Sequence, residues 1–133
     1  MIYDIPPVAK PRMTRSDKWK KRPAVTKYWN FKDKIRESGL KLTDKSIIVF
    51  YVPMPKTWSA RKQLANLRQP HKQRPDIDNY VKALFDALYE DDSHMWRVQA
   101  EKRWAYAGQI QIIEPLRVDK EPFEVHYEPI EDI

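Results

Sequence analysis

The chain has 133 residues, no cysteine, and a formal net charge of +6. The missing cysteines exclude disulfide bonds and thiolate metal sites. The sequence opens without the apolar run of a secretory signal, and no window approaches the roughly 18 apolar residues that a membrane helix needs. We therefore expect one soluble domain, residues 1–133, located in the cytoplasm.

The first expected elements are a strand, a basic loop and a helix. The strand covers residues 2–5 and is ended by two prolines. The basic arm spans about residues 8–27 and has no clear hydrophobic period, so we expect a loop. Aromatics among its cations suit phosphates and bases, although an ordinary solvated surface explains the same residues. The helix covers residues 28–38, with Gly39 as its stop.

The remaining elements predict an α+β fold, with a small mixed sheet that carries two or three helices. Residues 46–52 form a continuous β-branched and aromatic run, which is typical of a central strand buried on both faces. Helices are expected at residues 59–67 and 78–89, and strands at residues 98–106 and 109–113. The apolar stripe of the second of these helices comprises Val81, Leu84, Phe85 and Leu88. Most of the five tryptophans are expected in the core or in a dimer interface.

The charge is distributed unevenly along the chain. Residues 116–133 form an acidic tail, because they hold six acids and two bases. The first 115 residues therefore carry a net +10. A basic body with an acidic tail fits a nucleic-acid binder, and it fits equally a basic protein with a solvated acidic end.

A cluster of carboxylates interrupts the basic chain around the helix predicted at residues 78–89. Asp76 and Asp78 stand two positions apart, so in an extended segment both side chains point the same way and can reach one cation. Oxygen ligands without cysteine, and with little histidine nearby, favour Mg²⁺ or Mn²⁺. Such an ion can activate water for attack on a phosphodiester. Helix capping is the alternative, and it explains Asp78 more easily than Asp76.

Other members of the cluster also have two interpretations. Asp91 and Asp92 follow the helix and can be ordinary turn residues. Lys82 lies four residues from both Asp78 and Asp86, which predicts an exposed ion-pair ladder worth about 0.3–0.5 kcal/mol per pair. In the functional interpretation, Lys82 stabilises the charge that builds on a scissile phosphate.

Several motifs follow one another in a specific order between roughly residues 50 and 105. They are Pro53-Met54-Pro55-Lys56-Thr57-Trp58-Ser59, His71, Arg74-Pro75-Asp76-Ile77-Asp78-Asn79, Lys82, Leu84-Phe85-Asp86-Ala87-Leu88 and Glu90-Asp91-Asp92-Ser93. In this combination the chain resembles the RusA family of Holliday junction resolvases. The ordered set is far more specific than a lone pair of aspartates.

The resemblance implies a homodimeric endonuclease that uses Mg²⁺ or Mn²⁺ to cut four-way DNA junctions in recombination and repair. The paired aspartates of the family correspond to Asp76 and Asp78, and its third aspartate to Asp92, with Asp91 as the alternative. These three carboxylates would hold the metal. The essential lysine corresponds to Lys82, which would stabilise the transition state. A bacterial or phage origin is expected.

The position of Asp92 raises a geometric problem. The predicted helix is roughly 16 Å long, and Asp92 lies past its far end, whereas Asp78 stands at its start. The four residues after Leu88 span at most about 14 Å. Either the helix ends early, or Asp92 joins Asp76 and Asp78 of the other subunit.

The DNA contacts are expected in the basic segments and are expected to be largely to phosphates. The candidates are Lys10, Arg12, Arg15, Lys72 and Arg74. We found no base-reading motif, so the structure of branched DNA should dominate binding. Three alternatives stay open: a nuclease for flapped or other branched DNA, a non-catalytic junction-binding protein, and a structural or interaction protein without DNA binding.

Overall fold

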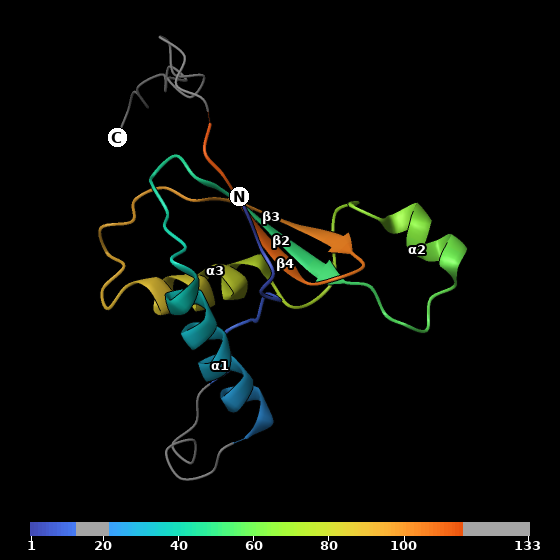
Figure 1. Cartoon of the computed structure of the whole chain (residues 1–133), viewed down its shortest axis with the longest axis horizontal. Coiled ribbons are helices and arrows are strands. Elements are labelled where there is room, and N and C mark those ends of the chain that lie inside the picture. The colour runs from blue at the N-terminus through green and yellow to red at the C-terminus, as the bar shows by residue number, and fades with distance from the viewer. Residues whose placement is uncertain (13–21, 116–133) are drawn as a thin grey trace, which may run out of the picture.

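The computed structural model describes residues 1–12 and 22–115. The acidic tail, Arg15, Trp19 and most of the central part of the basic arm lie outside these ranges. The elements are β1 (Ile2–Tyr3), α1 (Pro23–Ser38), β2 (Ile47–Pro53), α2 (Ala60–Asn66), α3 (Ile77–Leu88), β3 (Gln99–Ala105) and β4 (Gln109–Ile113). Figure 1 shows α1 and α3 together beside the sheet, while α2 stands apart beyond the ends of β2 and β3.

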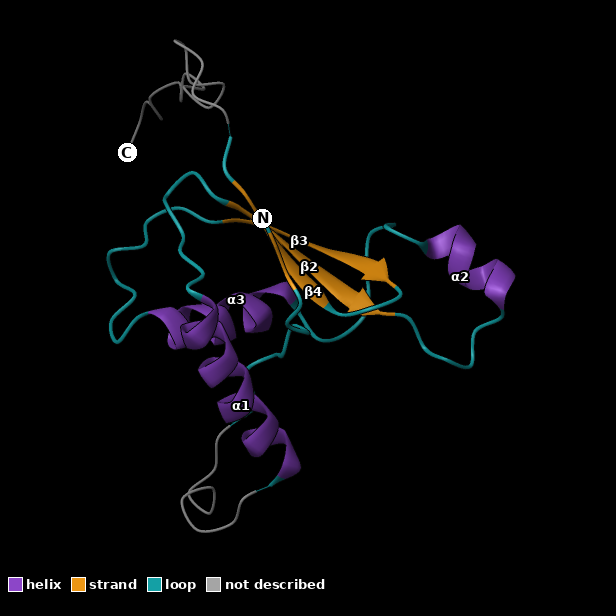
Figure 2. Ribbon diagram, in the orientation of Figure 1, coloured by secondary structure: helices purple, strands orange, loops and turns teal. Residues whose placement is uncertain are grey.

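The four strands form one mixed sheet in the order β1-β4-β2-β3 (Figure 2). β2 pairs in parallel with β3 and antiparallel with β4, and β1 pairs antiparallel with β4. Phe50 at the middle of β2 stands opposite Lys102 on one side and Ile110 on the other. The prediction of an α+β fold with a mixed sheet and a central strand near residues 46–52 is therefore confirmed.

The hydrophobic core lies between α1, α3 and one face of the sheet. Alternate residues of the two inner strands, including Ile48, Phe50, Ile110 and Ile112, are buried in this cluster. The ring of Phe50 stacks on Tyr80 of α3 with centroids 5.3 Å apart. Burial of β2 on both faces was predicted and holds only in part, because Ile47 and Tyr51 on the opposite face are half-buried.

Helix α1 begins at Pro23, five residues before the predicted start, so the expectation of a loop through residue 27 is wrong. Proline at the first helical turn is favoured because its missing N–H has no partner there in any case. The buried face of the helix comprises Val25, Tyr28, Phe31 and Ile35. Gly39 ends it with a left-handed φ of 72°, as predicted.

The other elements begin and end within two residues of the predicted bounds, and β1 is two residues shorter than expected. Trp104 is buried and Trp58 packs on it, but Trp29 and Trp96 are 40% and 74% exposed, and a place for these two in a dimer interface stays a prediction. Two of the four described tryptophans therefore lie outside the core. No helix within the described ranges is long and apolar enough to cross a membrane.

Candidate active site

Asp76 and Asp78 lie at the start of α3, and both side chains are exposed. Asp76 is the N-cap residue, but its side chain makes no capping hydrogen bond. Asp78 is the second residue inside the helix, so the extended pair that was predicted does not form, and Asp78 is not the cap. Capping therefore explains neither aspartate.

The loop that leads to these aspartates is held by Lys102 of β3. The Nζ atom of Lys102 donates to the carbonyl oxygens of Gln73 at 2.7 Å and Pro75 at 2.8 Å. The Arg74–Pro75 peptide bond between these carbonyls is cis. Because Pro75 directly precedes Asp76, one lysine of the sheet restricts the backbone that presents the first carboxylate. The sequence carries no local signal for this role.

Lys82 is placed one helical turn after Asp78. Its Nζ atom lies 3.5 Å from Asp78 Oδ2, and the two side chains are 59% and 62% exposed. An exposed pair of this kind is screened by water and worth little, about 0.3–0.5 kcal/mol. Lys82 can therefore leave the pair for a phosphate at small cost.

Asp86 has a structural position, which contradicts the predicted ladder with Lys82. Tyr28 of α1 donates its hydroxyl to Asp86 Oδ2 at 2.5 Å, and Lys10 Nζ lies 2.8 Å from the same oxygen. Burial alone would raise the pKa of Asp86, but the hydrogen bonds from Lys10 and Tyr28 and the charge of Lys10 outweigh it and lower that pKa. Asp86 thus joins α1 and the N-terminal segment to α3.

Asp91 and Asp92 follow α3 in a turn and differ in their contacts. Asp91 Oδ1 accepts a hydrogen bond from the Ser93 backbone N–H at 2.9 Å. The hydrogen bonds from Ser93 lower the pKa of the Asp91 carboxyl. The turn interpretation therefore describes Asp91, while the exposed Asp92 carboxylate makes no hydrogen bond or ion pair with the described residues.

The carboxylates of Asp76 and Asp78 are the kind of ligand that a hard divalent ion prefers, but the described residues of one chain bring too few of them together. Asp76 and Asp78 offer exposed carboxylate oxygens, which Mg²⁺ and Mn²⁺ prefer. Among residues 1–12 and 22–115, however, no three His, Asp or Glu side chains lie close enough to hold a metal ion. One chain alone does not bring Asp92 to the other two aspartates.

An apolar hollow of about 450 Å³ adjoins the aspartate end of α3. Asp78 and Lys82 line it on the polar side, and Phe85 and the 43% exposed Val98 are among its apolar residues. The neighbouring first half of β3, residues 99–101, has an outer edge without a strand partner among the described residues. An open strand edge beside apolar surface suits another chain.

The candidate DNA contacts occupy different environments. Lys10 is engaged with Asp86, whereas Arg12, Lys72 and Arg74 are exposed. Arg15 lies outside the described residues, so its role stays a prediction, as do the others. His71 is buried against Trp104, with ring centroids 4.2 Å apart, so it is not exposed for contact with DNA.

A family model described as Endodeoxyribonuclease RusA matches residues 4–113. The chain belongs to the RusA family. Family membership implies endodeoxyribonuclease activity on branched DNA, including Holliday junctions. Comparisons with curated proteins and with solved structures find no match.

Proposed function

We propose that this RusA-family chain resolves four-way DNA junctions by divalent-metal-assisted hydrolysis of phosphodiesters. Asp76 and Asp78 hold the ion, which is Mg²⁺ or Mn²⁺. When bound, such an ion lowers the pKa of a water and polarises the phosphate. Lys82 binds the phosphate and stabilises the charge that develops on it.

One observation carries this assignment: apart from an exposed ion pair and the place of Asp78 in the first turn of α3, the two aspartates have no structural partner. Neither caps α3, neither is buried, and the only carboxylate–cation contact between them and the rest of the described chain is the exposed pair with Lys82. They stand directly after Lys72 and Arg74. Carboxylates in a basic segment oppose DNA binding unless a cation intervenes, so their presence supports a metal site.

We further propose that the site is completed by a second copy of the chain, whose Asp92 joins Asp76 and Asp78. The support is threefold: residues 1–12 and 22–115 of one chain bring no third carboxylate to the pair, Asp92 follows the far end of the 12-residue α3, and an apolar hollow adjoins Asp78 beside a strand edge that is open among these residues. A two-fold dimer also suits a four-way junction, which needs two related cuts.

The chemical proposal is tested with a synthetic four-way junction in the presence of Mg²⁺, Mn²⁺ or EDTA. Wild-type protein should cut only with metal. Asp78→Asn should bind the junction as wild type does and cut at least about 100-fold more slowly, since metal-bound nucleophiles depend on their ligands. Asp33→Asn on the exposed part of α1 is the matched control and should cut normally. Full cutting by Asp78→Asn would end the proposal.

The shared site is tested by mixing subunits. A chain with Asp76→Asn and a chain with Asp92→Asn are each inactive, but their heterodimer contains one intact site if Asp92 acts in trans. Native mass spectrometry establishes that heterodimers form. If heterodimers form and cutting does not return, Asp92 does not complete the partner's site.

The nature of the substrate is decided by a panel of intact, flapped and four-way DNA. The four-way junction should be cut fastest, and faster cutting of flaps would favour the alternative of a nuclease for other branched DNA. Because the substrate arises where DNA recombines and is repaired, we infer that the protein works in the cytoplasm of a bacterium. We also infer that residues 1–133 form one endonuclease domain.

A further inference from the structure

Residues 54–75 carry a dense positive charge that the proposed metal site does not use. This stretch holds six cations and no acid, namely Lys56, Arg61, Lys62, Arg68, Lys72 and Arg74. All six are exposed, and none forms an ion pair with a carboxylate among the described residues. Four of them lie on or beside α2, outside the segments from which DNA contacts were predicted.

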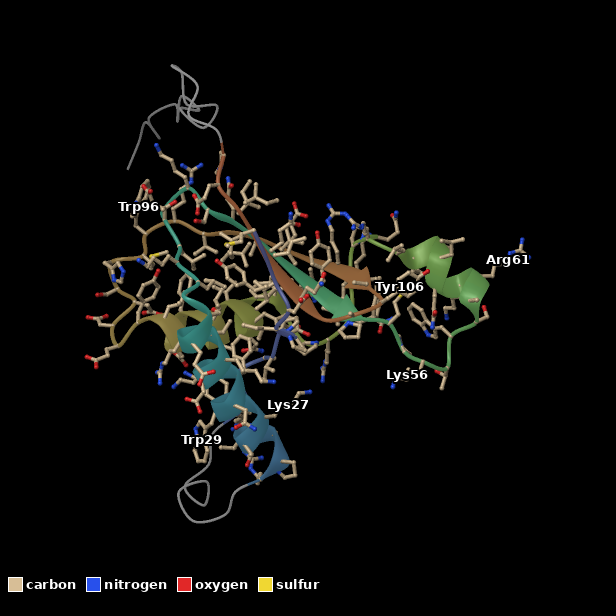
Figure 3. All side chains as sticks on the ribbon, viewed as in Figure 1. Lys27, Trp29, Lys56, Arg61, Trp96 and Tyr106 are labelled. Carbon is tan, nitrogen blue, oxygen red and sulfur yellow. The ribbon has the colours of Figure 1, made fainter. Side chains whose placement is uncertain are left out.

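Helix α2 projects from the body of the protein and buries nothing. None of its residues is buried, and Leu64 is 68% exposed. Figure 1 shows the helix beyond the ends of β2 and β3, and Figure 3 shows Lys56 and Arg61 pointing outward from this region. A helix that buries none of its residues contributes little to the core, so its charge requires another explanation.

The projection is nevertheless firmly attached at its base. Trp58 packs on the buried Trp104 with ring centroids 4.9 Å apart, and Lys62 Nζ lies 4.3 Å above the Trp58 ring. Ser59 caps α2 by accepting from the Lys62 backbone N–H at 3.1 Å. These contacts hold the start of the helix against the sheet.

The turn at Arg68, where the chain returns from α2 to the sheet, is also held by hydrogen bonds. Arg68 adopts a left-handed φ of 62°, which costs energy for a residue with a Cβ. Its backbone N–H donates to the Trp104 carbonyl at 2.8 Å, and its carbonyl accepts from Arg103 Nη1 at 2.8 Å. These two hydrogen bonds fix the backbone of the turn that follows α2.

We propose that residues 54–70, which we call the α2 arm, bind the phosphate backbone of one duplex arm of the DNA substrate. This inference rests on the proposed function and adds the surface that holds the substrate outside the cut site. Duplex DNA carries about one charge per 1.7 Å, so exposed unpaired cations gain affinity by releasing its counterions. Such contacts are independent of sequence and suit an enzyme that recognises a branch.

The chain geometry limits where the arm binds. Asp76 is six positions after Pro70, which is bridged to Arg103 of β3, so the two are at most about 22 Å apart. The step from Pro70 back to Asn66 adds at most about 14 Å, and the seven residues of α2 add about 10 Å. The arm therefore contacts phosphates within about one and a half helical turns of the cut, since a turn of duplex is about 34–36 Å long.

The test compares Lys56→Gln/Arg61→Gln with a control that removes two exposed lysines elsewhere, Lys34→Gln/Lys41→Gln. Lys62 is kept because it packs on Trp58. Binding of a synthetic four-way junction is measured in EDTA over a range of KCl concentrations. The slope of log K against log salt should fall by about two for the arm variant, because each phosphate contact contributes about one. The control should keep the wild-type slope.

Shortening the DNA gives a second measurement that does not depend on a variant. Wild-type protein should lose affinity when the junction arms are cut from about two helical turns to less than one. The arm variant should lose much less, since its contact is already missing. With saturating junction and Mg²⁺, the control variant should cut at the wild-type rate.

The outcomes separate this inference from the proposed function. If wild type cuts the junction but the arm variant keeps the wild-type salt slope, or both variants lose slope equally, the α2 arm does not bind the backbone and the nuclease assignment stands. If wild type neither binds nor cuts branched DNA, both proposals fail. Circular dichroism of each variant establishes that the fold is unchanged.

Discussion

The Nζ atom of Lys102 lies 2.8 Å from the carbonyl oxygen of Pro75, the residue that directly precedes Asp76. The same ammonium also holds the Gln73 carbonyl. Lys102 stands on β3 opposite Phe50 in the parallel pair β2–β3. The register of the sheet thus determines where the first carboxylate of the candidate site is presented.

Lys102→Met should loosen this loop without touching DNA or metal. We expect the unfolding free energy to fall by about 1–2 kcal/mol, because two carbonyls lose a charged donor. The Mg²⁺ concentration for half-maximal cutting should rise several-fold. Lys102→Arg should restore part of the metal response, and Lys41→Met is the neutral control. An unchanged metal response in Lys102→Met would show that the contact is merely structural.

Asp76→Ala should separate function from helix capping. The Asp76 side chain makes no capping hydrogen bond, so its removal should cost less than about 0.5 kcal/mol in urea unfolding. Ser59→Ala, which removes a real cap on α2, should cost about 1 kcal/mol. Cutting should be lost only in Asp76→Ala. A larger stability loss in Asp76→Ala than in Ser59→Ala would restore the capping interpretation.

Asp86 should make stability depend on acid pH. Its folded-state pKa is lowered, despite burial, by Lys10 and Tyr28. A carboxyl with a depressed folded pKa stabilises the fold above its unfolded pKa of about 3.9 and loses that contribution as pH falls through the folded pKa. Asp86→Asn should cost about 1–2 kcal/mol near neutral pH. The gap between wild type and variant should shrink below about pH 4.

Denaturant unfolding at several pH values measures this effect. Asp33→Asn is the matched control, because Asp33 is exposed on α1 and its variant should follow the wild-type curve. A constant gap between wild type and Asp86→Asn down to about pH 3 would contradict the contribution assigned to the Lys10–Asp86–Tyr28 contacts.

His71 should make the stability of the fold depend on pH in a second range, closer to neutral pH. Burial, followed by the charge of Lys102, lowers its pKa, and its buried Nδ1 has no hydrogen-bond partner in the part of the chain that the structure describes. Its neutral form stabilises the fold above the unfolded histidine pKa of about 6.5, and that contribution is lost as pH falls through the lowered folded value. His71→Phe keeps an aromatic ring against Trp104 and should remove the stability loss that begins as pH falls below about 6.5. A loss of equal size in the variant would exclude His71 as its source.

Local patterns predicted much of the fold. Helix α3 and strands β3 and β4 were located within two residues, because their apolar periodicity is regular and prolines or glycines flank them. The first turn of α1 was missed because basic residues surround it, although Pro23 was an available signal. Tyr28 and Phe31 lie on the buried face of α1, whereas Trp29 lies outside it.

The candidate site residues that lie in one continuous motif were predictable from the sequence. The contacts between distant segments that hold these residues in place were not. Asp76, Asp78 and Lys82 were selected from adjacent residues, and their roles remain proposals. The contact of Tyr28 with Asp86 joins residues 58 positions apart, and the hold of Lys102 on Pro75 depends on strand register. Neither contact can be predicted from the spacing of residues along the sequence, because each residue type is common in the segment where it occurs.

Because α2 buries no side chain, the fold tolerates changes in this projection better than in the elements around it. Its length and composition can be altered while Trp58 and the turn at Arg68 keep its two ends in place. Grafting a longer or differently charged helix between these points offers a way to engineer which DNA shapes a small nuclease prefers, with the hydrolytic apparatus left intact.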